Sequence, residues 1–259
     1  MAIIYGTNGN DTLNGGNEAD DIYGWQGDDS IRGGSGRDTL RGDFGNDTLW
    51  GGDDGDIIDG SFGNDTLYGE AGNDSIWGGN DGDDYLSGGA GVDILMGQVG
   101  DDTLWGDDEG DALLGADGND ILYGEGGNEN LWGGRGNDYI NGGSGNDRIN
   151  SGGVGYNSSE YDTLTGGTGA DTFLSLLGEA SGFFYEGSGY ATIMDFKSIE
   201  GDKIELKGNS SLYTESDIDF GVGSSALDTV IYKDGNEIAV LKDVSGSNFI
   251  LTSDTVFFV

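Results

Sequence analysis

The sequence predicts an all-β solenoid of short stacked strands, and three observations support this prediction. A nine-residue unit repeats from Gly6 to Leu174. Glycine makes up 55 of the 259 residues and is concentrated in the first part of each unit. The last three residues of each unit place one apolar side chain between two others, as a short strand does. One such unit buries almost nothing, so the array is stable only when its units stack.

Eighteen units fit between residues 6 and 174, with one extra residue near 80–84 and six inserted within 151–165. A typical unit runs from Gly33 to Arg41. Its first six residues, Gly33–Asp38, are expected to form a turn, because glycine tolerates positive φ. Its last three, Thr39–Arg41, are expected to form a strand with Leu40 turned inward.

The inward positions form one apolar row along the array. Two nine-residue units would make an 18-residue coil of turn, strand, turn, strand. The resulting core is thin, one Leu or Ile wide on each side, and buries too little area to offset chain entropy and charge repulsion alone. The row consists of Leu13, Ile22, Ile31, Leu40, Leu49, Ile58, Leu67, Ile76, Leu95, Leu104, Leu113, Leu122, Leu131, Ile140, Ile149 and Leu164.

Composition excludes several kinds of function. The chain has no Cys or His, so it has no disulfide framework, no thiolate or imidazole metal site, and no Ser-His-Asp triad. Its 10 basic and 49 acidic residues leave a net charge of −39. That charge argues against binding nucleic acid or an anionic membrane surface. No segment is apolar enough for a transmembrane helix, and we expect no enzymatic activity.

The sixth position of each unit is acidic. In an 18-residue coil, acidic residues two units apart would stack about 5 Å from one another and repel strongly. A hard divalent cation between successive turns would relieve this repulsion, and Ca²⁺ accepts six to eight oxygen ligands from carboxylates and backbone carbonyls. The position holds Asp11, Asp20, Asp29, Asp38, Asp47, Asp56, Asp65, Asp74, Asp84, Asp93, Asp102, Asp111, Asp120, Glu129, Asp138, Asp147, Asp162 and Asp171.

The units resemble GGxGxDxUx, the calcium-binding nonapeptide of RTX (hemolysin-type) proteins, in which U is a large apolar residue. This resemblance covers residues 6–174. It implies a right-handed parallel β-roll that holds several Ca²⁺ ions between consecutive turns. The acidic residues above would be ligands, together with backbone carbonyls of Gly-rich turns such as Gly33, Gly34, Gly36, Gly88, Gly89, Gly91, Gly133, Gly134, Gly136, Gly142, Gly143, Gly145, Gly166, Gly167 and Gly169.

Four residues depart from the repeat pattern. Glu18, Asp54 and Glu109 replace the fourth-position Gly, and Glu129 replaces the Asp. All four lie in even-numbered units, so one edge of an 18-residue coil would be more intact than the other. We expect fuller calcium occupancy on the odd edge, through Asp11, Asp29, Asp47, Asp65, Asp102, Asp120 and Asp138.

Aromatic residues end every third unit, at Tyr23, Trp50, Trp77, Trp105 and Trp132. Three interpretations remain open. The spacing is explained by duplication of a three-unit block, with aromatic residues favoured on strands. Alternatively, a three-sided coil made of three units would stack these rings in one ladder. The rings could also form a surface that contacts carbohydrate or a partner.

After Leu174 the repeat stops, so the expected division is a calcium-binding β-roll at 1–174 and a β-rich cap at 175–259. Strands are expected at Ala191–Phe196, Lys203–Leu206, Thr229–Tyr232, Ile238–Leu241 and Phe249–Leu251, with a hairpin turn at Asp234-Gly235. The segments ATIMDF and GDKIEL, and the terminus DTVFFV, resemble the region that follows RTX arrays and the uncleaved type I secretion signal. Met1–Tyr5 lacks the features of a cleaved signal peptide.

These observations lead to one main functional prediction. The chain would be a secreted, extracellular calcium-binding protein that folds when it meets Ca²⁺ outside the cell, and its partners would include the type I secretion machinery. The alternative is an extracellular adhesin or surface-layer component that associates with polysaccharide or a cell surface.

Overall fold

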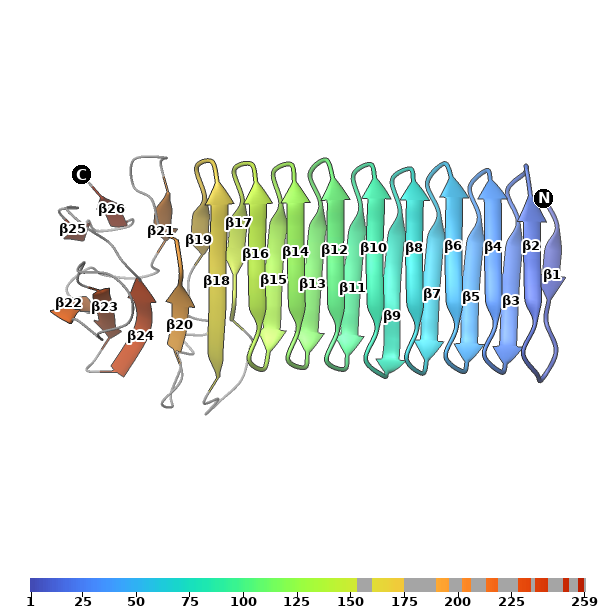
Figure 1. Cartoon of the computed structure of the whole chain (residues 1–259), viewed down its shortest axis with the longest axis horizontal. Helices are drawn as coiled ribbons and strands as arrows, with labels where there is room; N and C mark the ends of the chain where they lie inside the picture. The colour runs from blue at the N-terminus through green and yellow to red at the C-terminus, as the bar shows by residue number, and fades with distance from the viewer. Residues whose placement is uncertain are drawn as a thin grey trace.

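The computed structural model consists of strands and turns, stacked along one axis from β1 to β19 (Figure 1). It describes residues 1–152, 160–174, 190–195 and 202–205, and the backbone of the strands at 213–218, 228–233, 236–241, 249–251 and 256–258. The prediction of an all-β chain is confirmed, since the described residues contain no helix. It follows that none of them forms a helix able to cross a membrane.

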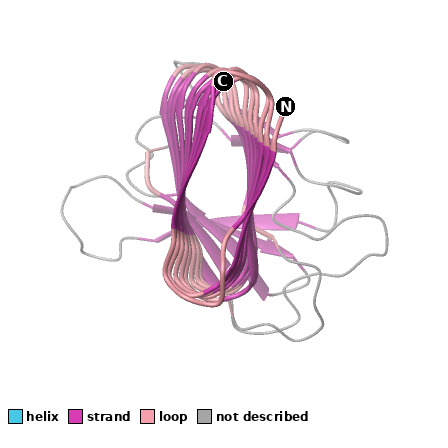
Figure 2. Cartoon of the chain, turned by 90° about the vertical axis from the view of Figure 1, so that its right-hand side faces the viewer, coloured by secondary structure: helices cyan, strands magenta, loops and turns pink. Residues whose placement is uncertain are grey.

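Two parallel sheets face each other along the stack, joined by turns at both edges (Figure 2). From β1 to β21 the odd-numbered strands form one sheet, called sheet A here, and the even-numbered strands up to β20 form sheet B. Sheet A contains β1 (Ile3–Tyr5), β3 (Asp21–Gln26), β5 (Thr39–Phe44), β7 (Ile57–Phe62), β9 (Ser75–Asp81), β11 (Ile94–Val99), β13 (Ala112–Asp117), β15 (Asn130–Arg135), β17 (Arg148–Asn150), β19 (Thr172–Leu174) and β21 (Lys203–Glu205). Sheet B contains β2 (Thr12–Gly16), β4 (Ser30–Ser35), β6 (Thr48–Asp53), β8 (Thr66–Ala71), β10 (Tyr85–Ala90), β12 (Thr103–Asp108), β14 (Ile121–Gly126), β16 (Tyr139–Ser144), β18 (Tyr161–Thr168) and β20 (Tyr190–Ile193).

Most strands are longer than the sequence pattern predicts. The strand expected at Thr39–Arg41 is β5, which continues to Phe44. The two residues that open the next unit therefore extend the ladder before the chain turns. In sheet B, for example, Gly34 pairs with Gly52 and Ser35 with Asp53. Only the remaining part of each Gly-rich half forms the turn.

The strand register shows that two units make one coil. Leu40 pairs with Ile22 on one side and with Ile58 on the other, each two units away in the sequence. The two insertions seen in the sequence appear as longer steps, because Tyr85 pairs with Thr66 and Tyr139 pairs with Thr163. The 18-residue coil is therefore confirmed, and a coil of three units is wrong.

The core is a double file of apolar side chains, one from each strand. These side chains are fully buried from Ile22 to Phe173. Leu86 and Phe173 also belong to this row, in addition to the residues predicted from the sequence. Leu13, at the N-terminal end, is only partly buried and packs against the row. Ala191, Ile193 and Ile204 continue the core beyond the last repeat.

Glycine is required in the stacked backbone because successive coils approach closely. Gly52 has a φ of 116°, in a region that residues with a side chain rarely adopt. A methyl group placed on Gly52 would overlap the carbonyl oxygen of Gly34 in the preceding coil. The Gly-rich composition therefore reflects the contact between coils as well as the sharpness of the turns.

The aromatic residues that end every third unit do not form one ladder. Tyr23, Trp77 and Trp132 lie on sheet A, whereas Trp50 and Trp105 lie on sheet B. A coil of two units places successive members on opposite sheets, so the three-sided ladder is wrong. Rings stack instead on neighbours one coil away. On sheet B, Trp50 stacks on Tyr68 with centroids 5.9 Å apart, and Trp105 stacks on Tyr123 at 4.2 Å.

Strands continue beyond Leu174. Here β20 pairs in parallel with β18, and β21 pairs in parallel with β19. Further strands are β22 (Tyr213–Ile218), β23 (Asp228–Lys233), β24 (Asn236–Leu241), β25 (Phe249–Leu251) and β26 (Val256–Phe258). The five predicted strands are present, Phe249–Leu251 with the predicted bounds and the other four with shifted ones. Strands β22 and β26 were not predicted, and the expected turn at Asp234-Gly235 lies outside the described residues.

Candidate metal centres along the two edges

The acidic residues at position six form two ladders, one along each edge of the roll. Each lies between a turn and the strand that follows it. From Asp29 to Asp147 these side chains are at most 3 % exposed. The Asp11 ladder contains Asp11, Asp29, Asp47, Asp65, Asp84, Asp102, Asp120, Asp138 and Asp162, and the Asp20 ladder contains Asp20, Asp38, Asp56, Asp74, Asp93, Asp111, Glu129, Asp147 and Asp171.

One oxygen of each carboxylate ties neighbouring coils together. The backbone N–H of Asp29 donates to Oδ1 of Asp47 at 2.7 Å, and the N–H of Asp47 donates to Oδ1 of Asp65 at 2.7 Å. The Asp20 ladder repeats this bond, for example from Asp93 N–H to Asp111 Oδ1 at 2.8 Å. Because these bonds join residues one coil apart, they hold the turns in register.

The other oxygen has no protein partner. It is buried and accepts no hydrogen bond in Asp29, Asp38, Asp47, Asp56, Asp65, Asp74, Asp84, Asp93, Asp102, Asp111, Asp120, Glu129, Asp138 and Asp147. Buried polar atoms nearly always have a partner, and a buried anion without one is costly. Asp11 differs, because its Oδ2 accepts from the backbone N–H of Thr7 at 2.6 Å and from its hydroxyl at 2.9 Å.

The unpartnered oxygen faces the first glycine of its own unit. A methyl group on Gly24 would overlap Oδ2 of Asp29 and would lie 2.7 Å from the carbonyl oxygen of Gly42, one coil on. Gly33, Gly88, Gly133, Gly142 and Gly166 lie against their own Asp in the same way. Most glycines at positions two and four have positive φ, among them Gly34, Gly36, Gly89, Gly91, Gly134, Gly136, Gly143, Gly145, Gly167 and Gly169.

Burial raises the pKa of these carboxyls, since a low-dielectric environment favours the uncharged form. The backbone hydrogen bond lowers each pKa, and neighbouring carboxylates raise most of them further. The pKa rises to about 8 for Asp65, Asp111 and Asp138, to about 7 for Asp56, Asp84, Asp120 and Glu129, and to about 6 for Asp47, Asp93, Asp102 and Asp147. Two rows of buried anions therefore need compensating positive charge.

The donor atoms suit a hard cation. They are carboxylate oxygens and backbone carbonyls, which Ca²⁺ prefers, and softer metals would need nitrogen or sulfur ligands. Among the described residues, no three acidic side chains converge on one point. A cation held here would therefore take a large share of its ligands from backbone carbonyls of the turns.

The four departures from the repeat leave the Asp20 ladder continuous. Asp54 and Glu109 each have a φ of 72°, in the left-handed region that Gly occupies at this position in other units. Glu129 accepts the backbone N–H of Asp111 through Oε2 at 2.5 Å and keeps Oε1 buried without a hydrogen bond. Glu18 is exposed and pairs with the amino group of Met1 at 2.6 Å. The Asp20 ladder thus runs through all four units.

The two edges differ at position five, a position that was not among the predicted site residues. Along the Asp11 edge, Asn and Asp side chains there accept backbone N–H groups from the following coil, as when Asn64 donates to Oδ1 of Asn46 at 2.8 Å. The Asp20 edge has such bonds where Asn73, Asn128 and Asn146 accept at 3.1, 2.8 and 2.9 Å. At its other units, Ala19, Arg37, Gly55, Val92 and Gly110 cannot supply the acceptor. The Asn-Asp dipeptide that recurs at positions five and six of the repeat could have identified this difference from the sequence.

Two further acidic residues lie beyond the last repeat. The backbone N–H of Asp171 donates to Oδ1 of Asp202 at 3.0 Å, so Asp202 adds a step to the Asp20 ladder. Asp202 precedes Lys203-Ile204-Glu205, which has the same pattern as the end of a repeat unit, and this signal could have identified it. Asp195 accepts the backbone N–H groups of Gly166 and Gly167, each at 2.8 Å.

Comparison with known proteins agrees with this geometry. The family model described as RTX calcium-binding nonapeptide repeat (4 copies) matches residues 3–31, 32–67, 50–81, 79–104, 105–138, 123–154 and 158–179, which together span more than half of the chain. The matched segments contain both ladders from Asp11 to Asp171. No curated protein matches the chain.

Proposed function

Because the chain belongs to the RTX calcium-binding nonapeptide repeat family, we propose that it is a secreted protein whose roll folds when it binds calcium outside the cell. The repeats bind multiple Ca²⁺ ions. Beyond calcium binding itself, we propose that the binding of Ca²⁺ drives the folding of the roll and that this folding occurs outside the cell.

The proposed ligands are the acidic residues of the two ladders and the carbonyl groups of the Gly-rich turns. The buried carboxylate oxygens without a partner are the observation that carries this assignment. In each of these carboxylates one oxygen already accepts a backbone N–H from the preceding coil, so the other is available to a cation. Ions between successive turns would then neutralise both ladders.

Calcium would supply the stability that the thin core lacks. Each coil buries only two large apolar side chains, yet it also buries two carboxylates. An ion that binds the folded state and not the unfolded chain stabilises folding by its binding free energy. Extracellular calcium modules have dissociation constants of about 10⁻⁴–10⁻³ M, so the chain would stay unfolded in the cytosol and fold after export.

The C-terminal region, residues 175–259, is proposed to cap the roll and to contain a type I secretion signal. Its resemblance to the region after RTX arrays supports this role. Export of the full chain, compared with a chain that ends at Leu174, in a host with a type I exporter tests it. Export of both forms to the same extent would contradict the assignment.

Circular dichroism of the full chain tests the folding switch. After treatment with EDTA the spectrum should be that of an unfolded chain, and CaCl₂ should restore the β signal. MgCl₂ at the same concentration is the control and should restore much less, since Mg²⁺ demands a tighter octahedron and keeps its waters. A chain that is folded in chelator and does not respond to calcium would refute the switch.

A second role is association with a polysaccharide or cell surface. Exposed aromatic side chains on the roll favour it, among them Trp25 and Phe44, which are 48 % and 55 % exposed. Calcium-dependent retention of the full chain on polysaccharide beads is the expected result. Neither role includes a catalytic step, in keeping with a repeat family that is typically structural or calcium-binding.

A further inference from the structure

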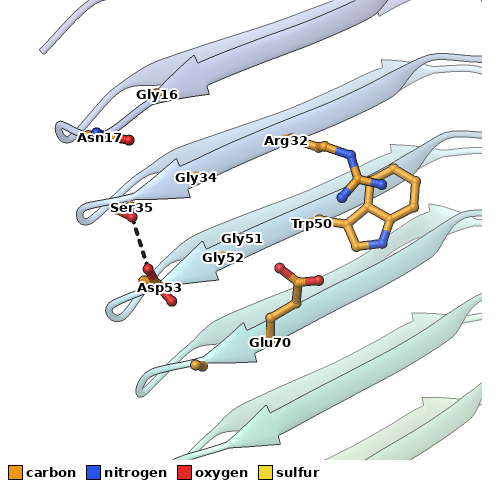
Figure 3. Close-up of a pocket in the computed structure, with 11 residues that line it drawn as sticks. Gly16, Asn17, Arg32, Gly34, Ser35, Trp50, Gly51, Gly52, Asp53 and Glu70 are labelled. Atoms are coloured by element: carbon orange, nitrogen blue, oxygen red, sulfur yellow. Dashed lines mark hydrogen bonds between the residues drawn. The ribbon is translucent and has the colours of Figure 1, made fainter.

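The outer face of sheet B contains a groove of about 360 Å³ across β2, β4 and β6. Arg32 and Trp50 form one wall, and Asn17, Ser35 and Asp53 lie along the other side (Figure 3). The floor is open because Gly16, Gly34 and Gly52 stack there without side chains. On the next strand, β8, the residue paired with Gly52 is Glu70, and its side chain closes one end of the groove.

Arg32 is the most informative residue in this groove. Its guanidinium lies 3.9 Å from the centroid of the Trp50 ring, where the cation and the aromatic face attract each other (Figure 3). It makes no ion pair or side-chain hydrogen bond with any residue in the described part of the chain. Arg37 and Arg148 also make no ion pair within the described residues, so Arg32 is distinguished by its place over an aromatic ring at the side of a groove.

The Trp50 ring lines one side of this groove, but its faces are already in contact with other side chains and are not free to stack on a bound sugar. Arg32 covers one face of the ring, and Tyr68 stacks on it with an interplanar angle of 14°. A bound molecule would therefore meet the edge of the indole. Binding would depend mainly on polar groups, with Trp50 excluding water from one side.

The polar groups offer hydrogen-bond donors and acceptors in alternation. Arg32 donates only, Asp53 and Glu70 accept only, and Asn17 and Ser35 can do both. Ser35 already donates to Asp53 at 2.9 Å, a bond that runs along their side of the groove (Figure 3). Hydroxyl groups, which donate and accept at once, are the natural complement of such a lining.

From this lining we propose that the groove binds a neutral glycan chain laid across β2, β4 and β6. Neighbouring strands lie about 4.8 Å apart, which is comparable to the length of one sugar unit, so successive units would meet equivalent positions on successive coils. This inference rests on the surface-association role proposed above and assigns it a site.

Charge favours a neutral glycan over an acidic one. The groove has one cationic group, Arg32, against the carboxylates of Asp53 and Glu70. The chain as a whole has a net charge of −39, which repels polyanions at long range. An acidic polysaccharide would gain the contact with Arg32, but the carboxylates of Asp53 and Glu70 and the negative charge of the whole chain would repel it.

Titration calorimetry of the full chain in CaCl₂ tests the site, with maltohexaose, cellohexaose and mannohexaose as neutral probes and a mannuronate hexamer as the acidic one. At least one neutral probe should bind, and the acidic one should bind more weakly. Arg32→Ala should weaken neutral binding at least tenfold, and Glu70→Gln should weaken it by a smaller factor. Arg135→Ala is the matched control, because Arg135 is an exposed arginine of the roll outside the groove.

The outcomes separate the site from the roles on which it depends. Arg32 is exposed, so its replacement should leave the calcium midpoint measured by circular dichroism unchanged. If the unaltered chain binds a neutral probe and Arg32→Ala and Glu70→Gln bind it equally well, the groove is wrong and surface association stands. If the calcium-folded chain binds none of the probes and is not retained on polysaccharide beads, both fail and the folding switch is unaffected. Stronger binding of the mannuronate hexamer would overturn the choice of a neutral ligand.

Discussion

The backbone N–H of Asp47 donates a 2.7 Å hydrogen bond to Oδ1 of Asp65 in the next coil, while Oδ2 of Asp65 is buried without a hydrogen-bond partner. The two oxygens of one carboxylate therefore have separate roles. In the folded roll one oxygen joins adjacent coils, and the other is left for a ligand from outside the chain. This division allows the two oxygens to be tested separately.

Replacing Asp65 by Asn should weaken calcium binding without breaking the ladder. The amide keeps an oxygen for the N–H of Asp47 but replaces Oδ2 with an uncharged NH₂ group. We expect a several-fold higher calcium midpoint in circular dichroism, because one anionic ligand is lost. Asp83→Asn is the matched control, since it removes the same charge from an exposed side chain nearby. Equal effects of the two variants would argue for general charge over ligation.

The metal-free chain should gain β structure as the pH falls. The pKa of Asp65 is raised to about 8 and that of Asp56 to about 7 in the folded state, against about 4 in an unfolded chain. A raised pKa means that the folded state favours the protonated acid. Its contribution to stability is fully present below about pH 4 and is lost as the pH rises toward 8.

Circular dichroism in EDTA between about pH 8 and about pH 5 should reveal this gain. Calcium affinity should move the opposite way and weaken with acidification, because protons and Ca²⁺ compete for the same oxygens. A metal-free chain that loses β structure on acidification would contradict the role of the buried carboxyls.

Replacing Gly52 by Ala should destabilise the roll. Gly52 has a φ of 116°, and an added methyl group would overlap the carbonyl oxygen of Gly34. We expect a loss of at least about 2 kcal/mol of unfolding free energy in calcium. Gly126→Ala is the control, because its added methyl group would meet its nearest neighbours at 3.7 Å, an ordinary contact. Thermal unfolding of both variants measures the difference.

Calcium occupancy should be fuller along the Asp11 edge, through Asp11, Asp29, Asp47, Asp65, Asp102, Asp120 and Asp138, and we add Asp84, which lies in the same ladder. Side chains at position five support successive turns along that edge, whereas on the Asp20 edge such support comes from Asn73, Asn128 and Asn146 and is interrupted at Ala19, Arg37, Gly55, Val92 and Gly110. Anomalous scattering from calcium-bound crystals would give the occupancy of each site. Equal occupancy on both edges would contradict this expectation.

Much of the fold could be predicted because each repeat contains its own signal. Leu40 and Ile58 share one position in their units, and the structure pairs them directly. The strand ends were predicted less well. The pair Gly51-Gly52 indicates a turn when one unit is considered alone, yet both residues lie within β6 once a neighbouring coil supplies hydrogen-bond partners. The ladder step at Asp202 was missed because the Gly-rich half of its unit is absent.

The sequence alone determined the nine-residue period, the alternation of turn and strand, the inward apolar row and the acidic position six, because all of these depend on residues close together in the chain. Only the tertiary structure decided that two units rather than three make a coil, that the aromatic residues are divided between two sheets, and that Arg32 lies over Trp50 beside a groove. These features depend on which units become neighbours, and that choice is made by hydrogen bonds and packing between coils, which the pattern of one unit does not contain.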